Sequence, residues 1–174
     1  NASRQVMTTD VMDPNDSSVE VLLEQNMMTS LRLTQQVAKR MIKQSADRPE
    51  GNVGTIVNLS SIAARSTRPE LMGYSIASAA MEQMTRSMAL ALAPNRIRVN
   101  AVAFGSVMSS SLNASMIEHE DWRDEIEDKT PLGRVAAAGE LVGAVQFLAS
   151  DASGFMTGEI ITVDGGRSLL DPVA

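Results

Sequence analysis

The chain has 174 residues, 44% of them hydrophobic, which is enough for one domain with a continuous buried core. Its formal net charge of −6 argues against sequence-independent nucleic-acid binding. The absence of cysteine excludes disulfides, a thiol nucleophile and cysteine-ligated zinc. The one histidine, His119, cannot form a histidine cluster. No apolar run reaches the roughly 20 residues of a membrane helix and no signal-peptide pattern is present, so we expect a soluble, cytoplasmic protein.

The first predicted helix runs from about Ser17 to about Lys43. Ser17 and Glu20 have the spacing of a capping box, and Asp16 adds negative charge beside the helix start. Apolar residues follow at helical spacing, at Leu23, Met27, Leu31, Ala38 and Met41. They predict an apolar stripe that packs on another part of the chain.

Strands and further helices alternate after this helix. A loop rich in Asp, Pro, Gly and Asn, residues 45–54, leads to a β-branched strand at 55–59. An alanine-rich helix is predicted from about Gly73 to Leu92, and it should end sharply because the residue before Pro94 is disfavoured in the helical conformation. The remaining predicted elements are a strand at 97–104, polar loops and short helices to about 129, a helix at about 139–149 and a strand at 159–163.

The strands carry apolar residues at successive positions and are separated by helices. This pattern indicates a parallel sheet with helices on both faces, so the predicted fold is a single α/β domain with a doubly wound, mostly parallel sheet. Ligands of such sheets bind beyond the carboxyl ends of the strands. Those ends fall at residues 59–61, 104–109 and 163–166.

Five segments carry a family resemblance through their order and spacing. They are Thr55-Ile-Val-Asn-Leu-Ser-Ser61, Tyr74, Arg96-Ile-Arg-Val-Asn-Ala-Val-Ala-Phe-Gly105, Pro131-Leu-Gly-Arg134 and Thr157-Gly-Glu-Ile-Ile-Thr-Val-Asp-Gly-Gly166. Together they resemble the short-chain dehydrogenase/reductase family, and within it the 3-oxoacyl-acyl-carrier-protein reductases of fatty acid biosynthesis. The resemblance implies a Rossmann-like fold and an oxidoreductase that uses NADP or NAD to reduce a carbonyl compound.

Ser61 and Tyr74 match the family's catalytic serine and tyrosine, which lie thirteen residues apart here. Hydride delivery to a carbonyl builds negative charge on its oxygen, so the resemblance implies that Ser61 polarises this oxygen while Tyr74 donates a proton. Taken without the resemblance, Ser61 is an ordinary turn residue, and Tyr74 is a tyrosine that packs its ring in the core.

Two further positions match catalytic residues of the family. Asn26 is similar to the helix asparagine that helps to hold a proton-relay water, although polar residues in helices usually bond to a nearby carbonyl or face solvent. Ser78 stands where the family has lysine, four residues after the tyrosine and on the same helix face. A free tyrosine has a pKa near 10 and a close cation favours its phenolate by about one to three units, so serine predicts a rate lower by roughly ten- to a thousand-fold. Arg86 is too far along the helix to replace the lysine.

The resemblance also implies cofactor contacts. Phe104 and Gly105 replace the family's Pro-Gly turn, so an aromatic ring covers the cofactor or lines the substrate pocket. The expected cofactor-binding residues are Asn1, Tyr74, Phe104, Gly105, Val107 and Ser109. The closing turn at Asp164-Gly165-Gly166 is expected to be structural, with glycines that permit positive φ. No metal site is expected.

The start of the family's fold has no counterpart in the sequence. Relatives begin with a strand, a Gly-x-x-x-Gly-x-Gly turn and a helix that receives the cofactor pyrophosphate. The early glycines here, Gly51 and Gly54, precede a strand and belong to an ordinary loop. We therefore expect residues 1–174 to be the C-terminal two thirds of the fold, lacking its first βα units, either through loss of upstream residues or in a naturally short protein.

Two functions remain open. The first is an NAD(P)-dependent reductase of a 3-oxoacyl or other small carbonyl substrate, beneath a mobile cover at about 109–129. An acyl-carrier-protein-linked substrate would need a basic docking patch, for which the local candidates are Arg65, Arg68, Arg96 and Arg98. The second is a catalytically silent oligomerisation subunit, because the family's helices that match those of Asn26 and Tyr74 pair in homodimers or homotetramers. No nucleic-acid or membrane partner is expected.

Overall fold

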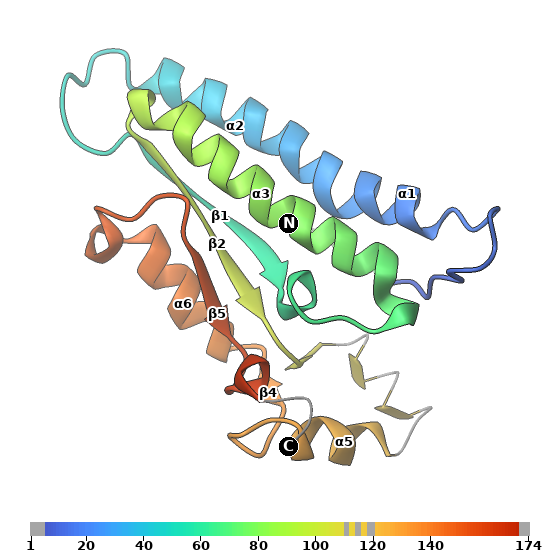
Figure 1. Cartoon of the computed structure of the whole chain (residues 1–174). Coiled ribbons are helices and arrows are strands. Elements are labelled where there is room, and N and C mark those ends of the chain that lie inside the picture. Colours follow the sequence, from blue (N-terminus) through green and yellow to red (C-terminus); the bar gives the residue numbers. More distant parts are fainter. Residues whose placement is uncertain (1–5, 110–111, 114–115, 118–120, 171–174) are drawn as a thin grey trace.

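A parallel sheet forms the centre of the molecule (Figure 1). The computed structural model describes residues 6–109, 112–113, 116–117 and 121–170. The strands β1 (Gly54–Ser61), β2 (Ile97–Phe104) and β5 (Ile160–Val163) lie in the order β1-β2-β5 and are all parallel. Helices α2 (Thr29–Gln44) and α3 (Met72–Leu92) cover one face, and α6 (Glu140–Ala149) lies on the other. The predicted α/β fold with a parallel, doubly covered sheet is confirmed.

The strand register brings three chain segments to one edge of the sheet. β1 and β2 pair from Gly54 opposite Ile97 to Ser61 opposite Phe104, and Phe104 in turn lies opposite Val163 of β5. Ser61, Phe104 and Val163 therefore end their strands in the same row. Whatever follows these three residues meets at the carboxyl edge of the sheet.

The core lies between the sheet and the helices α2 and α3. Its largest cluster joins Ala38 of α2, Ala89 and Leu92 of α3, and Ile97 and Val99 of β2, all at most 9% exposed. Burying a side chain such as leucine or isoleucine stabilises a fold by about 1.5–3 kcal/mol, so this cluster anchors both helices. The mainly apolar sequence of β2 follows from its place in the middle of the sheet.

The first predicted helix is continuous in direction but irregular. It consists of α1 (Ser18–Leu22), a π-helical segment (Leu23–Met28) and α2. The expected capping box does not form, because the side chain of Ser17 makes no capping hydrogen bond. Instead Asp16 Oδ1 accepts a hydrogen bond from the backbone N–H of Ser18 at 2.6 Å.

The π-helical segment also changes which side of this helix is buried. The buried residues are Ser18, Leu22, Asn26, Ser30, Thr34 and Ala38. Of the apolar stripe predicted from regular α-helical spacing only Ala38 is fully buried, and the others are half-buried. A π turn holds more residues than an α turn, so it rotates the side chains after it and a regular helical projection is wrong here.

The other predicted elements agree closely with the structure. α3 ends at Leu92, where a 3-10 turn (Ala93–Asn95) contains Pro94, as the proline predicts. Shorter elements occupy the predicted loop region. They are β3 (Val107–Met108), which pairs in parallel with β4 (Ala136–Ala137), and α5 (Trp122–Asp128). No described helix has the length and apolar character needed to cross a membrane.

A buried arginine, Arg98, ties α6 to the sheet. Its guanidinium donates hydrogen bonds to the carbonyl oxygens of Leu148 at 3.2 Å, Ser150 at 3.1 Å and Ser153 at 2.8 Å. It also donates to Thr55 Oγ1 on β1 at 2.9 Å. Because the carbonyls at a helix C-terminus lack partners within the helix and carry partial negative charge, a cation here stabilises the end of α6.

Candidate active site

The two predicted catalytic hydroxyl groups come from neighbouring parts of the carboxyl edge. Ser61 ends β1 and is 7% exposed, and its Oγ accepts a hydrogen bond from the backbone N–H of Ala63 at 3.2 Å. Ala63 packs in a buried cluster with Leu22, Tyr74 and Ala77. Tyr74, in the first turn of α3, is 9% exposed. Ser61 and Tyr74 thus both adjoin the same alanine, Ser61 through a hydrogen bond and Tyr74 through packing.

Close packing between α1 and α3 fixes the position of Tyr74. A Cβ added to Gly73 would lie 3.1 Å from Leu22 Cδ1 and 3.2 Å from Val19 Cα, so only glycine lets the two helices approach this closely. The backbone N–H of Gly73 donates to Thr9 Oγ1 at 3.1 Å, and Ser18 Oγ donates to the same oxygen at 2.9 Å. Tyr74 therefore follows a helix start that is held on two sides.

Asn26 lies within the π-helical segment and is 2% exposed. Its backbone carbonyl accepts a hydrogen bond from Ser30 Oγ at 3.2 Å. π-helical turns are rare and frequently occur at functional sites. This distortion was not predicted from the sequence, whose only hint is a polar residue on the buried helix face.

Ser78 is completely buried one turn after Tyr74. Its backbone carbonyl accepts a hydrogen bond from Ser60 Oγ at 3.3 Å. One further turn along the helix, the buried Glu82 pairs with Arg65 at 3.3 Å and with Arg86 at 3.4 Å. Arg65 and Arg86 thus both bind the carboxylate of Glu82, and the Arg65–Glu82 pair is a contact that sequence reasoning missed.

Three predicted cofactor-contact positions follow the end of β2. Gly105 lies against the closing turn, where an added Cβ would approach Asp164 Cβ to 2.9 Å, so glycine is required by close contact with β5. Val107 pairs with Ala136 in the small sheet. Ser109 Oγ accepts a hydrogen bond from the backbone N–H of Leu112 at 3.1 Å. Phe104 is half-buried in the edge row, and Asn1 lies outside the described residues.

The closing turn has the predicted conformation. Gly165 and Gly166 have φ values of +67° and +88°. Asp164 caps the turn, because its carboxylate accepts hydrogen bonds from the backbone N–H groups of Gly166 at 2.9 Å and Ser168 at 2.7 Å. Burial alone would raise the pKa of Asp164, but these hydrogen bonds and the charge of Arg167 outweigh burial and lower it.

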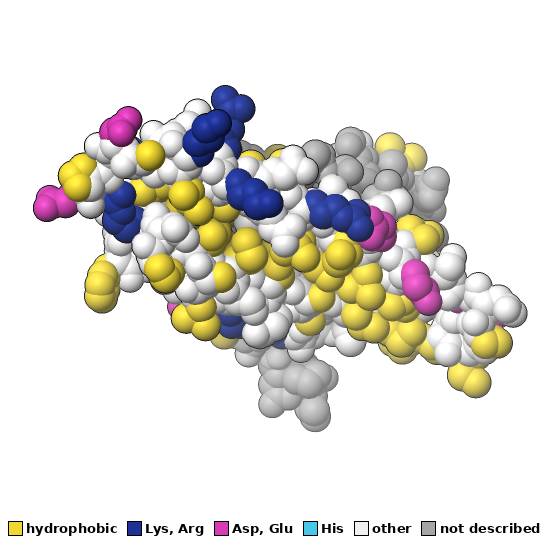
Figure 2. Space-filling view, turned by 90° about the horizontal axis from the view of Figure 1, so that it is seen from above, with side chains coloured by type: hydrophobic (Ala, Val, Ile, Leu, Met, Phe, Trp, Pro, Cys, Tyr) yellow, Lys and Arg dark blue, Asp and Glu magenta, His cyan; other side chains and the backbone are white. Residues whose placement is uncertain are grey.

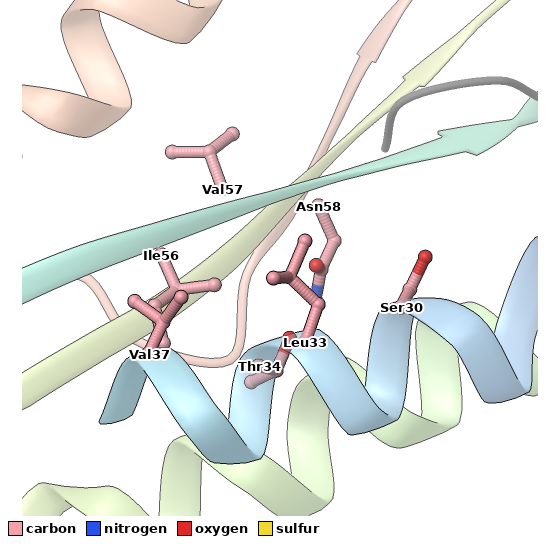
Figure 3. Close-up of a pocket in the computed structure, with 7 residues that line it drawn as sticks. All are labelled: Ser30, Leu33, Thr34, Val37, Ile56, Val57 and Asn58. Atoms are coloured by element: carbon pink, nitrogen blue, oxygen red, sulfur yellow. The ribbon is translucent and has the colours of Figure 1, made fainter. Parts of the chain in front are cut away.

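A small pocket lies away from these residues, between α2 and the outer edge of β1 (Figure 3). It is lined by Ser30, Leu33, Thr34, Val37, Ile56, Val57 and Asn58. Ile56 and Asn58 point toward α2, and Val57 points away from it. Its volume of about 120 Å³ is below the roughly 300 Å³ of the smallest usual ligand pockets. This edge of β1 pairs with no other strand in the described part of the chain.

The four arginines considered as a docking cluster do not come together. Arg96 and Arg98 lie at the amino end of β2, where Arg96 donates to the backbone carbonyls of Arg48 and Gly51 and Arg98 is buried. Arg65 and Arg68 follow the carboxyl end of β1. An eight-residue strand spans roughly 25 Å, so the two pairs lie at opposite ends of the sheet. These four arginines therefore do not form one basic patch.

Comparison with known proteins identifies relatives along almost the whole chain. A family model described as Enoyl-(Acyl carrier protein) reductase matches residues 2–168. The chain is 32% identical over 148 residues to L-rhamnose 1-dehydrogenase (NAD(P)(+)) of Sphingomonas sp. strain SKA58, covering 85% of this chain and 56% of that protein. It is also 32% identical over 147 residues to the 3-oxoacyl-[acyl-carrier-protein] reductase FabG of Aquifex aeolicus, covering 84% of this chain and 55% of that protein.

A solved structure agrees in fold. The gluconate 5-dehydrogenase of Burkholderia cenocepacia, in complex with NADP and tartrate, superposes with a TM-score of 0.85 at 29% identity, covering 98% of this chain and 64% of that one. The chain therefore spans only somewhat more than half the length of the relatives that it matches.

Proposed function

The chain belongs to the short-chain dehydrogenase/reductase family, and we propose that it forms the carbonyl-binding part of an NAD(P)-dependent oxidoreductase. In this proposal Tyr74 is the proton donor and Ser61 polarises the carbonyl oxygen. The observation that carries the proposal is the packing of Ser61 and Tyr74 around Ala63 at the carboxyl edge of a parallel sheet. Ligands bind at this edge in open α/β sheets.

The environment of the two side chains suits this chemistry. Both are almost completely buried, so water competes little for a substrate oxygen placed between them. As a carbonyl is reduced, the Ser61 hydroxyl donates a hydrogen bond to the oxygen that gains negative charge. Tyr74 transfers its proton to that oxygen and completes the alcohol. Asn26, on the neighbouring π-helical turn, is proposed to hold a water that returns the proton to Tyr74.

A nicotinamide cofactor would supply or accept the hydride. The described residues fit only one end of such a cofactor. Phe104, Gly105, Val107 and Ser109 line the carboxyl end of β2 beside Ser61 and are proposed to hold the nicotinamide ring. The described chain offers no glycine-rich turn between a strand and a helix for the pyrophosphate, and NADP and NAD both remain open.

The outer edge of β1 is the proposed attachment site for nucleotide-binding βα units. This edge pairs with no other strand among the described residues, and Leu33 at the neighbouring pocket of Figure 3 is 53% exposed. An open edge strand beside exposed apolar side chains favours pairing with another strand. In this proposal residues 1–174 are the C-terminal two thirds of one doubly wound domain.

The substrate is proposed to be a small carbonyl compound. Relatives of similar identity act on different substrates according to their names, among them L-rhamnose and a 3-oxoacyl group on acyl-carrier protein. Gluconate is another, in a protein of Gluconobacter oxydans that is 32% identical over 145 residues. Because the four arginines weighed as a docking patch lie apart in the described part of the chain, we favour a free small molecule over a carrier-linked one. The protein is proposed to act in the cytoplasm.

A catalytically silent oligomerisation subunit is the second candidate. The observation that favours it is Ser78, which supplies no cation beside Tyr74 and is completely buried. Figure 2 shows a band of hydrophobic side chains over α2 and α3, where Leu33, Ile76 and Leu90 are among the exposed large hydrophobics. Such a band favours pairing of these helices with a second copy in a homodimer or homotetramer. Membranes and nucleic acids are not proposed as partners.

Substituting lysine for Ser78 separates the two candidates. If Tyr74 is the acid, Ser78→Lys should raise the rate of carbonyl reduction by about ten- to a thousand-fold in the full natural protein, because a nearby ammonium stabilises the phenolate. The same change should shift the ultraviolet titration of Tyr74 to lower pH, followed as the part of the absorbance that a Tyr74→Phe substitution removes.

Ser87→Lys is the matched control, since Ser87 is exposed on the same helix. It adds the same charge without approaching Tyr74, so neither the rate nor the titration should change. If the reduction rate and the tyrosine titration are the same in the Ser78→Lys and Ser87→Lys proteins, the oligomerisation role is favoured. A loss of stability of about 1–3 kcal/mol in Ser78→Lys is expected from overpacking and is measured separately by urea unfolding.

A further inference from the structure

An arginine lies at the carboxyl edge without a carboxylate partner. Arg167 follows the closing turn and is half-buried, and its Nη1 donates a hydrogen bond to Ser106 Oγ at 2.5 Å. Ser106 directly follows Gly105 at the end of β2. The capping hydrogen bonds of Asp164 to Gly166 and Ser168 hold the backbone on both sides of Arg167. Its guanidinium is therefore fixed at the same sheet edge as Ser61.

Of the cations near this edge, Arg65 is paired with a carboxylate, whereas Arg167 is not. Ion pairs within the described ranges use Arg32, Arg65, Arg86, Arg123, Lys129 and Arg134. No described carboxylate lies within 4 Å of Arg167, although the chain has an excess of acidic residues. A partly buried charge without an opposite charge is unfavourable, so an anion bound there would be stabilised.

A second arginine adds to the positive potential. Arg68 lies on the segment that connects Ser61 to Tyr74, and its side chain is exposed beside Thr67 and Met72. Burial lowers the pKa of Arg167, and the charge of Arg68 lowers it further, while Glu125 and Asp164 act in the opposite direction. Glu125 is itself paired with Lys129 at 2.7 Å. Arg68 follows the end of β1 and Arg167 follows the turn after β5, so both side chains start from the carboxyl edge of the sheet.

We propose that Arg68 and Arg167 bind the carboxylate of a small keto acid or hydroxy acid whose carbonyl or alcohol carbon lies at Ser61 and Tyr74. This inference deepens the proposed function and rests on it. β1 and β5 are two strand spacings apart, roughly 10 Å. Arginine side chains shorten this gap, so an acid with a few carbons between its two functional groups fits. The hydroxyl of Ser106 is a further donor to the carboxylate.

Binding of 4-oxopentanoate and its methyl ester tests the proposal. The two probes share the ketone, but only the acid carries charge. Titration calorimetry should show that the wild-type chain binds the acid more tightly than the ester. Arg167→Gln and Arg68→Gln should each weaken binding of the acid by at least about tenfold, the effect of one lost charge-assisted hydrogen bond. Binding of the ester should not change. Arg167→Lys should retain part of the preference for the acid.

Arg123→Gln is the matched control, because Arg123 is an exposed cation on α5 that pairs with Glu127. It removes the same charge from the chain, so any loss of affinity for the acid in this variant measures the effect of net charge alone. Equal binding of acid and ester, or equal losses in the Arg123→Gln and Arg167→Gln variants, overturns the anion site.

Turnover separates this outcome from a failure of the proposed function. A natural protein that reduces the acid and the ester with equal kcat/KM is a reductase without an anion site. Arginine-dependent binding of the acid in a protein that reduces no carbonyl leaves the anion site intact and removes the reductase proposal.

Discussion

Replacing Tyr74 by phenylalanine should lower kcat for carbonyl reduction by about 10²- to 10⁴-fold in the full natural protein, the usual contribution of a positioned general acid. The change removes the proton donor and keeps the ring that packs against Leu22, Ala63 and Ala77. Steady-state oxidation of the reduced nicotinamide cofactor measures the effect. The free energy of unfolding should fall by only about 1 kcal/mol, because the change removes a single hydroxyl group and keeps the ring.

Unfolding in urea is the control for this result. A Tyr74→Phe protein of near wild-type stability and unchanged turnover would remove Tyr74 from the mechanism. A large loss of stability would instead show that the hydroxyl holds the site together, and the ratio of kcat to the folded fraction then decides between the two roles.

Arg98→Met should lower the free energy of unfolding by about 3–5 kcal/mol, the largest stability effect that we expect of any single substitution. Methionine keeps much of the side-chain length, so little cavity forms. The substitution leaves the carbonyls of Leu148, Ser150 and Ser153 without their cationic donor inside the structure. Each of these carbonyls keeps another donor, the Ser153 hydroxyl or a backbone N–H, so the cost is the loss of several hydrogen bonds to a charged donor, each contributing about 1.5–3 kcal/mol. Urea unfolding followed by far-ultraviolet circular dichroism measures the loss.

The matched control is Arg32→Met, since the Arg32 side chain is 57% exposed and pairs with an exposed Glu24. Exposed ion pairs contribute about 1 kcal/mol or less. If Arg98→Met costs no more than Arg32→Met, water must reach the end of α6 and the described network adds little to stability.

The strands and most helices could be predicted from local patterns. The bounds of β2 agree because its middle place in the sheet makes nearly every residue apolar, and Pro94 marks the end of α3. The π-helical segment could not be predicted, since its extra residue is stabilised by tertiary packing around Asn26 and Ser30. The predicted cap at Ser17 is absent, and the carboxylate of Asp16 instead accepts a hydrogen bond from the backbone N–H of Ser18 at the helix start.

Only part of the candidate site, too, could be predicted from the sequence. Ser61 ends a strand and Tyr74 begins a helix, and a short connection joins the two, so their spacing in the sequence predicts that they lie near one another. Their catalytic roles stay a prediction. The supposed cluster of Arg65, Arg68, Arg96 and Arg98 failed because nearness in sequence says nothing of which end of a strand a residue occupies. Arg167 escaped notice since only the turn geometry directs it to Ser106.

A double-mutant cycle for carbonyl reduction tests most directly whether Ser61 and Tyr74 act on one oxygen atom. It compares kcat/KM of the wild-type protein, Ser61→Ala, Tyr74→Phe and the double variant. Groups that act as a unit are strongly non-additive, so the double variant should lose little more than Tyr74→Phe alone. Losses that simply multiply, or a wild-type protein that neither binds a nicotinamide cofactor nor reduces any carbonyl, would contradict the account.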